Sequence, residues 1–212
     1  MKIIGITGNM GSGKSTAARV CGELGAATID LDAVAHQLYN DDDGLKEVLV
    51  NAFGEDILSD KRQIDRKALG QIVFNDRKKL DTLNRLVHPR IINEVRTRTH
   101  IYKTMQKDAV VIHGALLLDI LGKDFLDEIW VTTANEKNTL VRLQMRGIDT
   151  DEAKKRRLMQ TDEKKLMAQA DVVLQNDWPK KEFEDNVQET YELRILVSKY
   201  GTKDNPKSSL PN

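Results

Sequence analysis

The sequence has very little cysteine: Cys21 is the single one among 212 residues. One cysteine excludes an intramolecular disulfide and a zinc site built from cysteines. Long hydrophobic runs are also missing, since no stretch approaches the roughly 18 consecutive apolar residues of a transmembrane helix. The first residues, MKIIGITG, lack the apolar core and the small-residue cleavage site of a signal peptide. We therefore expect a cytoplasmic protein without a membrane partner.

The chain has no excess charge of either sign, because 33 Lys and Arg residues balance 33 Asp and Glu residues. This balance argues against a large nucleic-acid-binding surface, so we expect no nucleic-acid partner and only local anion sites. Apolar residues make up 40% and charged residues 31% of the chain, as is typical of a globular protein. The four histidines show no spacing typical of a transition-metal site. For the oligomeric state, we expect a monomer or a weak homo-oligomer.

Short apolar runs bounded by turns predict five strands, and the segments between them have helical periodicity. The strands are expected at residues 2–7, 27–30, 109–112, 128–132 and 171–174. From about residue 32 to residue 105 the pattern is almost entirely helical, and His88-Pro89 is predicted to separate two helices. We therefore predict an α/β protein of the doubly wound type, with an all-helical insertion after the second strand.

The segment Gly8–Ser15, GNMGSGKS, matches the phosphate-loop pattern G-x-x-x-x-G-K-[ST] and lies between a predicted strand and a predicted helix. The glycines let successive backbone N–H groups point toward an anion, and the helix N-terminus adds partial positive charge. A lysine at this place reaches the β- and γ-phosphates, and the hydroxyl that follows it binds Mg²⁺. We expect a nucleotide to be bound by Gly8, Gly11, Ser12, Gly13, Lys14, Ser15 and Thr16.

Two carboxylates, Asp30 and Asp32, come at the end of the second predicted strand. Because the carboxyl ends of parallel strands share one edge of a sheet, we expect both to lie near the γ-phosphate. One could accept a proton from an attacking hydroxyl and the other could hold a magnesium-bound water. The alternative is that Asp32 caps a helix over residues 33–39. Asp30 and Ser15 are the candidate magnesium ligands.

Basic residues gather in the last third of the chain. Arg142 and Arg146 are four apart and hence on one helix face. Further cations follow in the next polar stretch: Arg156, Arg157 and Lys164. A mobile flap with arginines would screen phosphate charge and exclude water. The alternative is a solvated helical hairpin whose charges pair with neighbouring acidic residues. For His88, a structural hydrogen bond and a substrate contact both remain open.

Taken together, these motifs resemble those of the dephospho-coenzyme A kinase family over nearly the whole chain. The opening ITGNMGSGKST is similar to that family's LTGGIGSGKST, and residues 26–32 end in its D-x-D signature. Residues 64–74 are similar to its D-R-x-x-L…V-F helix, and Leu86–Pro89 matches its L-x-H-P element. Its Q…AD…I-x-N run corresponds to Gln160, Ala170-Asp171 and Asn176. The order and spacing of these motifs carry the resemblance.

The resemblance implies a P-loop kinase with a five-stranded parallel sheet flanked by helices, an inserted helical substrate domain and a helical lid. The nucleotide-binding core would comprise residues 1–32, 106–146 and 168–200. Residues 33–105 would form the acceptor-binding domain and residues 147–167 the lid, followed by a disordered tail at 201–212.

The reaction implied by the resemblance is transfer of the ATP γ-phosphoryl group, with Mg²⁺, to the ribose 3′-hydroxyl of the small-molecule substrate 3′-dephospho-coenzyme A. Asp32 would be the catalytic base, with Lys14 and the loop amides as the phosphate clamp. Arg142 and Arg146 would be lid contacts, Arg146 being catalytic, and Asn176 would lie near the adenine of ATP. The long helical insertion suits an acceptor with a pantetheine arm, whose phosphates would be held by Arg66, His88 and Arg90.

Two positions depart from the family pattern. Many members have an acidic residue after strand three where this chain has His113, so Asp30 or water would have to support magnesium. The family's lid often reads Arg-Asp where this chain has Arg146-Gly147. Two alternatives come from other classes: a nucleoside or nucleotide monophosphate kinase, and a non-enzymatic nucleotide-binding module. Residues 135–138 do not fit the guanine-specific N-K-x-D pattern of GTPases.

Overall fold

The structure is a computed structural model that describes residues 1–74, 76–145, 147 and 162–196. Three of the predictions lie outside these residues: Arg146, most of the lid at 147–167, and the tail at 201–212. Within the described ranges, no helix combines the length and the apolar character needed to cross a membrane.

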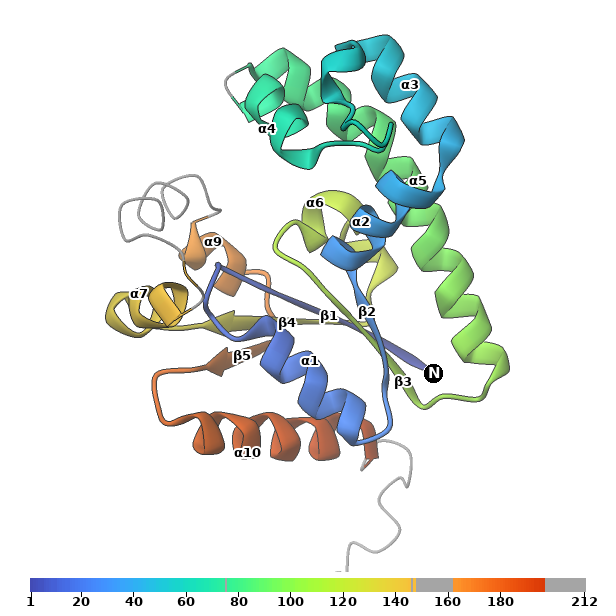
Figure 1. Cartoon of the computed structure of the whole chain (residues 1–212). Helices are drawn as coiled ribbons and strands as arrows, with labels where there is room; N and C mark the ends of the chain where they lie inside the picture. The colour runs from blue at the N-terminus through green and yellow to red at the C-terminus, as the bar shows by residue number, and fades with distance from the viewer. Residues whose placement is uncertain (75, 146, 148–161, 197–212) are drawn as a thin grey trace, which may run out of the picture.

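Five parallel strands form the central sheet, in the spatial order β2-β3-β1-β4-β5 (Figure 1). Their bounds are β1 Lys2–Gly8, β2 Ala27–Asp30, β3 Ala109–His113, β4 Glu128–Thr133 and β5 Val172–Gln175. All five predicted strands are confirmed, each with ends displaced by at most one residue. Because β1 is the middle strand, the loop that follows it leaves the centre of the sheet edge.

Helices cover both faces of this sheet, and the strand side chains alternate between them. In β3, Ala109 and Val111 pack toward α1 (Lys14–Glu23) and α10 (Lys180–Tyr191), which lie side by side (Figure 1). The intervening Val110 and Ile112 belong to the core on the opposite face. That face is covered by α6 (Leu117–Leu121), α9 (Glu163–Met167) and part of α5. This period-two burial on both faces explains why the strands read as continuous apolar runs.

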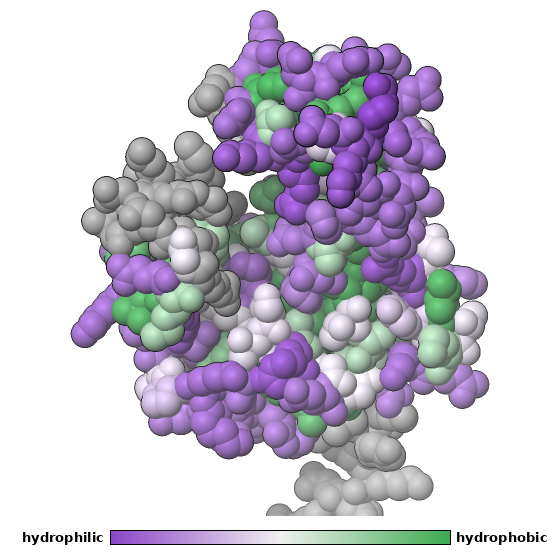
Figure 2. All heavy atoms as spheres, viewed as in Figure 1, coloured by the Kyte–Doolittle hydropathy of each residue, from purple (hydrophilic) through white to green (hydrophobic). Residues whose placement is uncertain are grey.

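The predicted helical insertion stands at one side of the sheet, at the top of Figure 1. It comprises α2 (Leu31–Asp41), α3 (Asp43–Phe53), η1 (Glu55–Ile57), α4 (Arg66–Phe74) and α5 (Arg77–Thr104). Aspartate side chains begin two of these helices: Asp42 accepts from the Leu45 N–H, and Asp76 accepts from the Lys78 and Lys79 N–H groups. The molecular surface is hollowed between this segment and the sheet (Figure 2).

The remaining described elements connect and close the core. They are η2 (Lys123–Phe125), α7 (Glu136–Met145) and the π-helical turn η3 (Glu192–Leu196). At the start of β4, Glu128 is buried and binds the Lys2 ammonium and the Trp130 indole N–H, which joins β1 to β4.

The prediction of two helices separated at His88-Pro89 is wrong, because α5 is one helix of 28 residues with Pro89 inside it. Proline within a helix removes one backbone hydrogen bond and costs roughly 3 kcal/mol. Val87, Ile91 and Val95 recur at four-residue spacing and are all buried in the core shared with β2 and β3. Burial of this continuous apolar stripe outweighs the local cost of the proline.

Candidate active site

The phosphate loop connects β1 to α1 and depends on glycines with positive φ. Gly8, Gly11 and Gly13 have φ values of 144°, 81° and 114°. A Cβ atom on Gly8 would lie 2.3 Å from the Thr132 carbonyl oxygen, and one on Gly13 would lie 2.3 Å from Asn176 Nδ2. Both the backbone conformation and the close approach of neighbours therefore require glycine here.

Lys14 is the first residue of α1 and folds over the loop. Its Nζ donates hydrogen bonds to the carbonyl oxygens of Gly8 at 2.8 Å and Asn9 at 3.0 Å. No side chain caps this helix, because the N-cap residue is Gly13. The first N–H groups of α1 thus face the loop opening, as in other anion-binding helix ends. Ser15 is exposed and Thr16 is half-buried in this first turn.

Ser12 contributes to the loop from its inner side. Its side chain is buried, and its hydroxyl lies 2.6 Å from the Thr132 hydroxyl, which donates in turn to the Thr7 carbonyl oxygen. The Ser12 hydroxyl therefore anchors the loop to β4. Sequence reasoning predicted Ser12 but missed Thr132, whose role depends on a neighbouring strand.

Arg142 and Asn176 brace the same loop from α7 and the end of β5. Arg142 donates to the Gly11 carbonyl oxygen at 3.3 Å, and its other terminal nitrogen donates to Asn176 O and Oδ1, each at 2.9 Å. The Asn176 amide donates to the Ser12 carbonyl oxygen at 2.8 Å and is 5% exposed. The two predicted residues therefore lie together against the loop backbone, where they fix its shape.

We expect Asn176→Ala to lower the free energy of unfolding by about 1–3 kcal/mol. The substitution removes the amide that donates to the buried carbonyl of Ser12 and the Oδ1 acceptor of Arg142, which keeps its hydrogen bond to the backbone carbonyl of residue 176. Thermal and denaturant unfolding measure the effect, with Gln188→Ala on the exposed side of α10 as the control. Unchanged stability of the Asn176 variant would contradict this bracing role.

The alternative in which Asp32 caps the following helix is wrong. Helix α2 begins at Leu31, and the cap is Asp30, whose Oδ1 accepts from the N–H groups of Asp32 at 2.9 Å and Ala33 at 3.2 Å. The helix starts two residues earlier than predicted because Asp30 takes the extended backbone conformation of an N-cap. Asp32 lies in the first turn with its side chain exposed.

His113 lies at the end of β3, beside Asp30 in the sheet register. It is 8% exposed, and its Nε2 lies 4.0 Å from Asp30 Oδ2. Burial lowers the pKa of His113, Lys14 lowers it further, and the carboxylates of Asp30 and Asp32 partly offset this effect. The surroundings of His113 thus favour its neutral form, and the loop lysine and both aspartates are close enough to influence its pKa.

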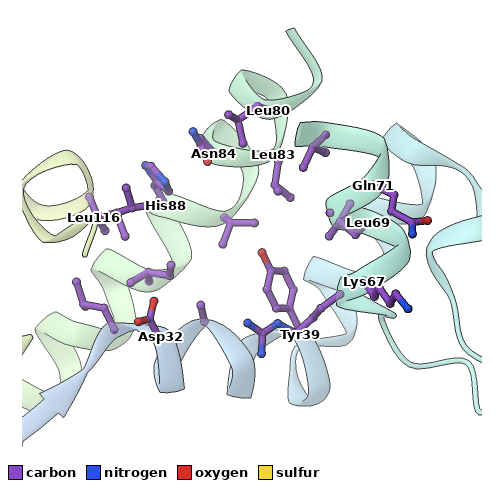
Figure 3. A pocket seen from close by; sticks show the side chains of 18 residues that line it. Asp32, Tyr39, Lys67, Leu69, Gln71, Leu80, Leu83, Asn84, His88 and Leu116 are labelled. Atoms are coloured by element: carbon purple, nitrogen blue, oxygen red, sulfur yellow. The ribbon is translucent and has the colours of Figure 1, made fainter. Parts of the chain in front are cut away.

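A pocket of about 840 Å³ extends from Asp32 into the helical insertion. In Figure 3, Asp32 lies at one end with His88 and Leu116, and Lys67 lies at the opposite end. The Tyr39 ring points into the space between them. Most of the wall is apolar: Leu31, Ala35, Leu69, Val73, Leu80, Leu83, Val87, Ile91, Leu116 and Ile120. An elongated, largely apolar ligand with polar groups at its ends would fit this shape.

Two of the three predicted acceptor contacts line this pocket. Arg66 lines the pocket, and one of its guanidinium nitrogens lies 3.2 Å from His36 Nδ1. His88 also lines the pocket. Burial lowers the pKa of His88, and the nearby Asp119 carboxylate partly offsets this effect. Arg90 lies outside the lining, because its guanidinium forms a 2.6 Å ion pair with Asp42 at the start of α3. Its place in the structure is therefore a brace between α3 and α5.

Comparison with known proteins identifies the family. A family model described as dephospho-CoA kinase matches residues 2–182. The chain belongs to the dephospho-CoA kinase family. This confirms the resemblance seen in the motifs, and this family is one of ATP-dependent kinases.

Relatives of the dephospho-CoA kinase family match over most of the chain. The dephospho-CoA kinase of Carboxydothermus hydrogenoformans is 37% identical over 177 residues, which cover 83% of this chain and 86% of that protein. That of Geobacter sulfurreducens is 33% identical over 196 residues, which cover 92% of this chain and 100% of that protein.

Solved structures confirm the predicted fold of a five-stranded parallel sheet flanked by helices. The structure of TT1252 from Thermus thermophilus matches with a TM-score of 0.75 at 28% identity and covers 89% of this chain and 95% of that one. The dephospho-CoA kinase from Campylobacter jejuni matches with a TM-score of 0.63 at 22% identity, covering 92% and 98%. A shikimate kinase from Acinetobacter baumannii shares the fold with a TM-score of 0.53 at 16% identity, covering 95% and 96%.

Proposed function

We propose that this chain transfers the γ-phosphoryl group of ATP to the ribose 3′-hydroxyl of 3′-dephospho-coenzyme A, giving coenzyme A and ADP. The observation that carries the proposal is the position of Asp32. Its carboxylate lines the pocket in the helical insertion, and it shares the surroundings of His113 with Lys14 of the phosphate loop. One carboxylate thus joins an acceptor-sized pocket to a phosphate-binding loop.

On the nucleotide side, the loop amides and Lys14 would hold the β- and γ-phosphates. Arg142 and Asn176 keep the loop in the required shape through its carbonyl oxygens. Among the described residues no group of three or more His, Cys, Asp and Glu side chains is arranged to hold a metal ion. Magnesium commonly takes few protein ligands beside phosphate oxygens and water, so Ser15 with an aspartate suffices. When bound, Mg²⁺ would neutralise charge that develops on the β- and γ-phosphates.

Asp30 and Asp32 would have different roles, one toward magnesium and one toward the acceptor hydroxyl. Asp30 Oδ1 is engaged as the cap of α2, which leaves Oδ2 for a magnesium-bound water. Asp32 would accept the proton of the 3′-hydroxyl while the new oxygen–phosphorus bond forms and the bond to the β-phosphate oxygen breaks. The proton ends on Asp32, and ADP leaves with the electron pair of the broken bond.

On the acceptor side, we assign residues 33–105 as the acceptor-binding domain. The apolar wall and the Tyr39 ring suit the base and the pantetheine arm of the acceptor. Arg66 and Lys67 line the pocket and would bind its diphosphate. His88 lies near Asp32 at the reacting end. Fixing the 3′-hydroxyl beside Asp32 would supply the rate gain that comes from positioning. The sheet and its flanking helices would form the nucleotide-binding core, with the lid at 147–167.

Comparative turnover with ATP tests the proposal. Dephospho-coenzyme A, AMP, CMP and adenosine are offered as acceptors at equal concentration, and ADP formation is measured. We expect dephospho-coenzyme A to be phosphorylated fastest, because it alone fills the length of the pocket. If AMP or CMP is faster by about tenfold or more, the monophosphate-kinase alternative holds. If no acceptor is phosphorylated while ATP binds, the chain is a nucleotide-binding module.

We expect Arg66→Ala to raise the KM for dephospho-coenzyme A by about tenfold, with a much smaller change in kcat. Arg66 would bind the diphosphate and not the reacting 3′-hydroxyl, so its contact with the acceptor would be the same in the ground state and in the transition state. Arg85→Ala, an exposed arginine of α5 outside the pocket, is the matched control. A KM equal to that of the control would exclude Arg66 from acceptor binding.

A further inference from the structure

A second groove lies at the edge of the sheet opposite to the phosphate loop. It has a volume of about 300 Å³ and lies between the first residues of β1 and the last turns of α5, beside the N-terminus in Figure 1. Its lining residues are Met1, Ile3, Arg96, Thr99, His100, Lys103 and Phe125. It shares no lining residue with the acceptor pocket.

The α5 side of this groove is basic. Arg96, His100 and Lys103 follow one another at four- and three-residue spacing, which places them on one helix face. No hydrogen bond or ion pair joins the side chains of these three residues to another residue of the described chain. The lining contains no acidic side chain, and the nearby Asp127 carboxylate is engaged by the Ile3 N–H at 2.7 Å. The groove therefore offers uncompensated nitrogen donors.

Thr99 is the buried polar residue of the groove wall. It is 8% exposed, lines the groove, and its hydroxyl has no hydrogen-bond partner within the described residues. Thr97 and Thr104 of the same helix donate to backbone carbonyl oxygens at 3.0 and 2.7 Å. The Thr99 hydroxyl oxygen is itself enclosed by protein atoms, so the donors that a ligand in the groove can reach are those of Arg96, His100 and Lys103.

The opposite wall is apolar, formed by Met1, Ile3 and Phe125. A ligand that matches both walls carries a compact anion on one side and a small hydrocarbon group on the other. Phosphate has several acceptor oxygens, which suits donors from Arg96, His100 and Lys103 together. We propose that this groove binds a small phosphate ester, with the phosphate on the α5 side and the organic group on the apolar wall.

Methyl NMR with phenyl phosphate tests the proposal in the full chain. The protein is saturated with magnesium and a non-hydrolysable ATP analogue, so that the phosphate loop is filled. The methyl groups of Ile3 report on the groove, and those of Ile91 and Ile120 report on the acceptor pocket. We expect a saturable shift of Ile3 in the low millimolar range.

Variants assign the binding to the proposed residues. Exchanging both Arg96 and Lys103 for Ala should weaken the binding seen at Ile3 by about tenfold or more. Thr99→Val should bind as the wild type does, because the enclosed hydroxyl does not reach the ligand. Thr99→Val is also expected to leave the melting temperature unchanged or raise it, because the lost hydroxyl has no partner in the protein. Arg85→Ala and Thr97→Val are the matched controls, and both should bind as the wild type does.

Three results would overturn the proposal: no shift of Ile3 up to about 10 mM probe, a shift confined to Ile91 and Ile120, or equal affinity in all variants. Inorganic phosphate is titrated in parallel. Affinity equal to that of phenyl phosphate would overturn the assignment of an organic ester, because the apolar wall would then contribute nothing. None of these results depends on which acceptor the enzyme phosphorylates.

Discussion

Lys14→Ala is expected to lower kcat/KM for phosphoryl transfer by at least about a thousandfold while the fold remains intact. The Nζ atom lies over the carbonyl oxygens of Gly8 and Asn9 at the loop opening, where it would meet the β- and γ-phosphates. Removal of this cation leaves the negative charge of the transition state without a countercharge where water is excluded. Steady-state kinetics and the melting temperature are measured together.

Two further variants separate the charge of Lys14 from its geometry. Lys78→Ala removes an exposed lysine of α5 and should leave turnover unchanged. Lys14→Arg keeps the charge, but a planar guanidinium cannot occupy the same position over two adjacent carbonyl oxygens. We expect it to retain nucleotide binding better than transfer. Near-normal turnover by folded Lys14→Ala would remove the basis for the phosphate-loop assignment.

Asp32→Asn is expected to lower kcat by at least about a hundredfold, with little change in the KM for ATP. The amide has nearly the same size as the carboxylate but cannot accept the proton of the 3′-hydroxyl. Since Asp30 and not Asp32 caps α2, the melting temperature should hardly move. Single-turnover kinetics with saturating dephospho-coenzyme A isolate the chemical step.

Variants of Asp30 provide the matched comparison for Asp32→Asn. Asp30→Ala removes the cap and should cost about 1 kcal/mol of stability, whereas Asp30→Asn keeps an acceptor for the Asp32 and Ala33 N–H groups. A stability loss in Asp32→Asn without a loss of rate would show that Asp32 has a structural role and that the base is another group.

Sequence reasoning succeeded where the signal is local. Each strand is a short apolar run, and the phosphate loop is a fixed pattern of glycines before a lysine, so both were predicted closely. The roles predicted for the two aspartates at the active site stay predictions, and which of the two caps α2 depends on the backbone conformation at Asp30. Aspartate is a favoured N-cap residue at either position, so the sequence alone does not show whether Asp30 or Asp32 is the cap.

The errors and omissions concern contacts between distant segments. Pro89 signals a helix boundary locally, and only the burial of Val87, Ile91 and Val95 shows why α5 continues through it. For Arg90, a predicted contact of the acceptor's phosphates, nothing in the sequence indicated its ion pair with Asp42, 48 positions away. Tyr39 and Lys67 were missed because a pocket between α2, α4 and α5 has no signature in any one of them.

The strand order also has a consequence for the folding of the chain. The central strand β1 is the first part to be synthesised, but its neighbours in the sheet are β3 and β4, which follow roughly a hundred residues later. Closing so long a loop costs chain entropy before any pairing of β1 compensates for it. The phosphate loop therefore has no sheet to support it until most of the chain has been made. We expect nucleotide binding to be acquired late, when β1 inserts between strands that are already in place.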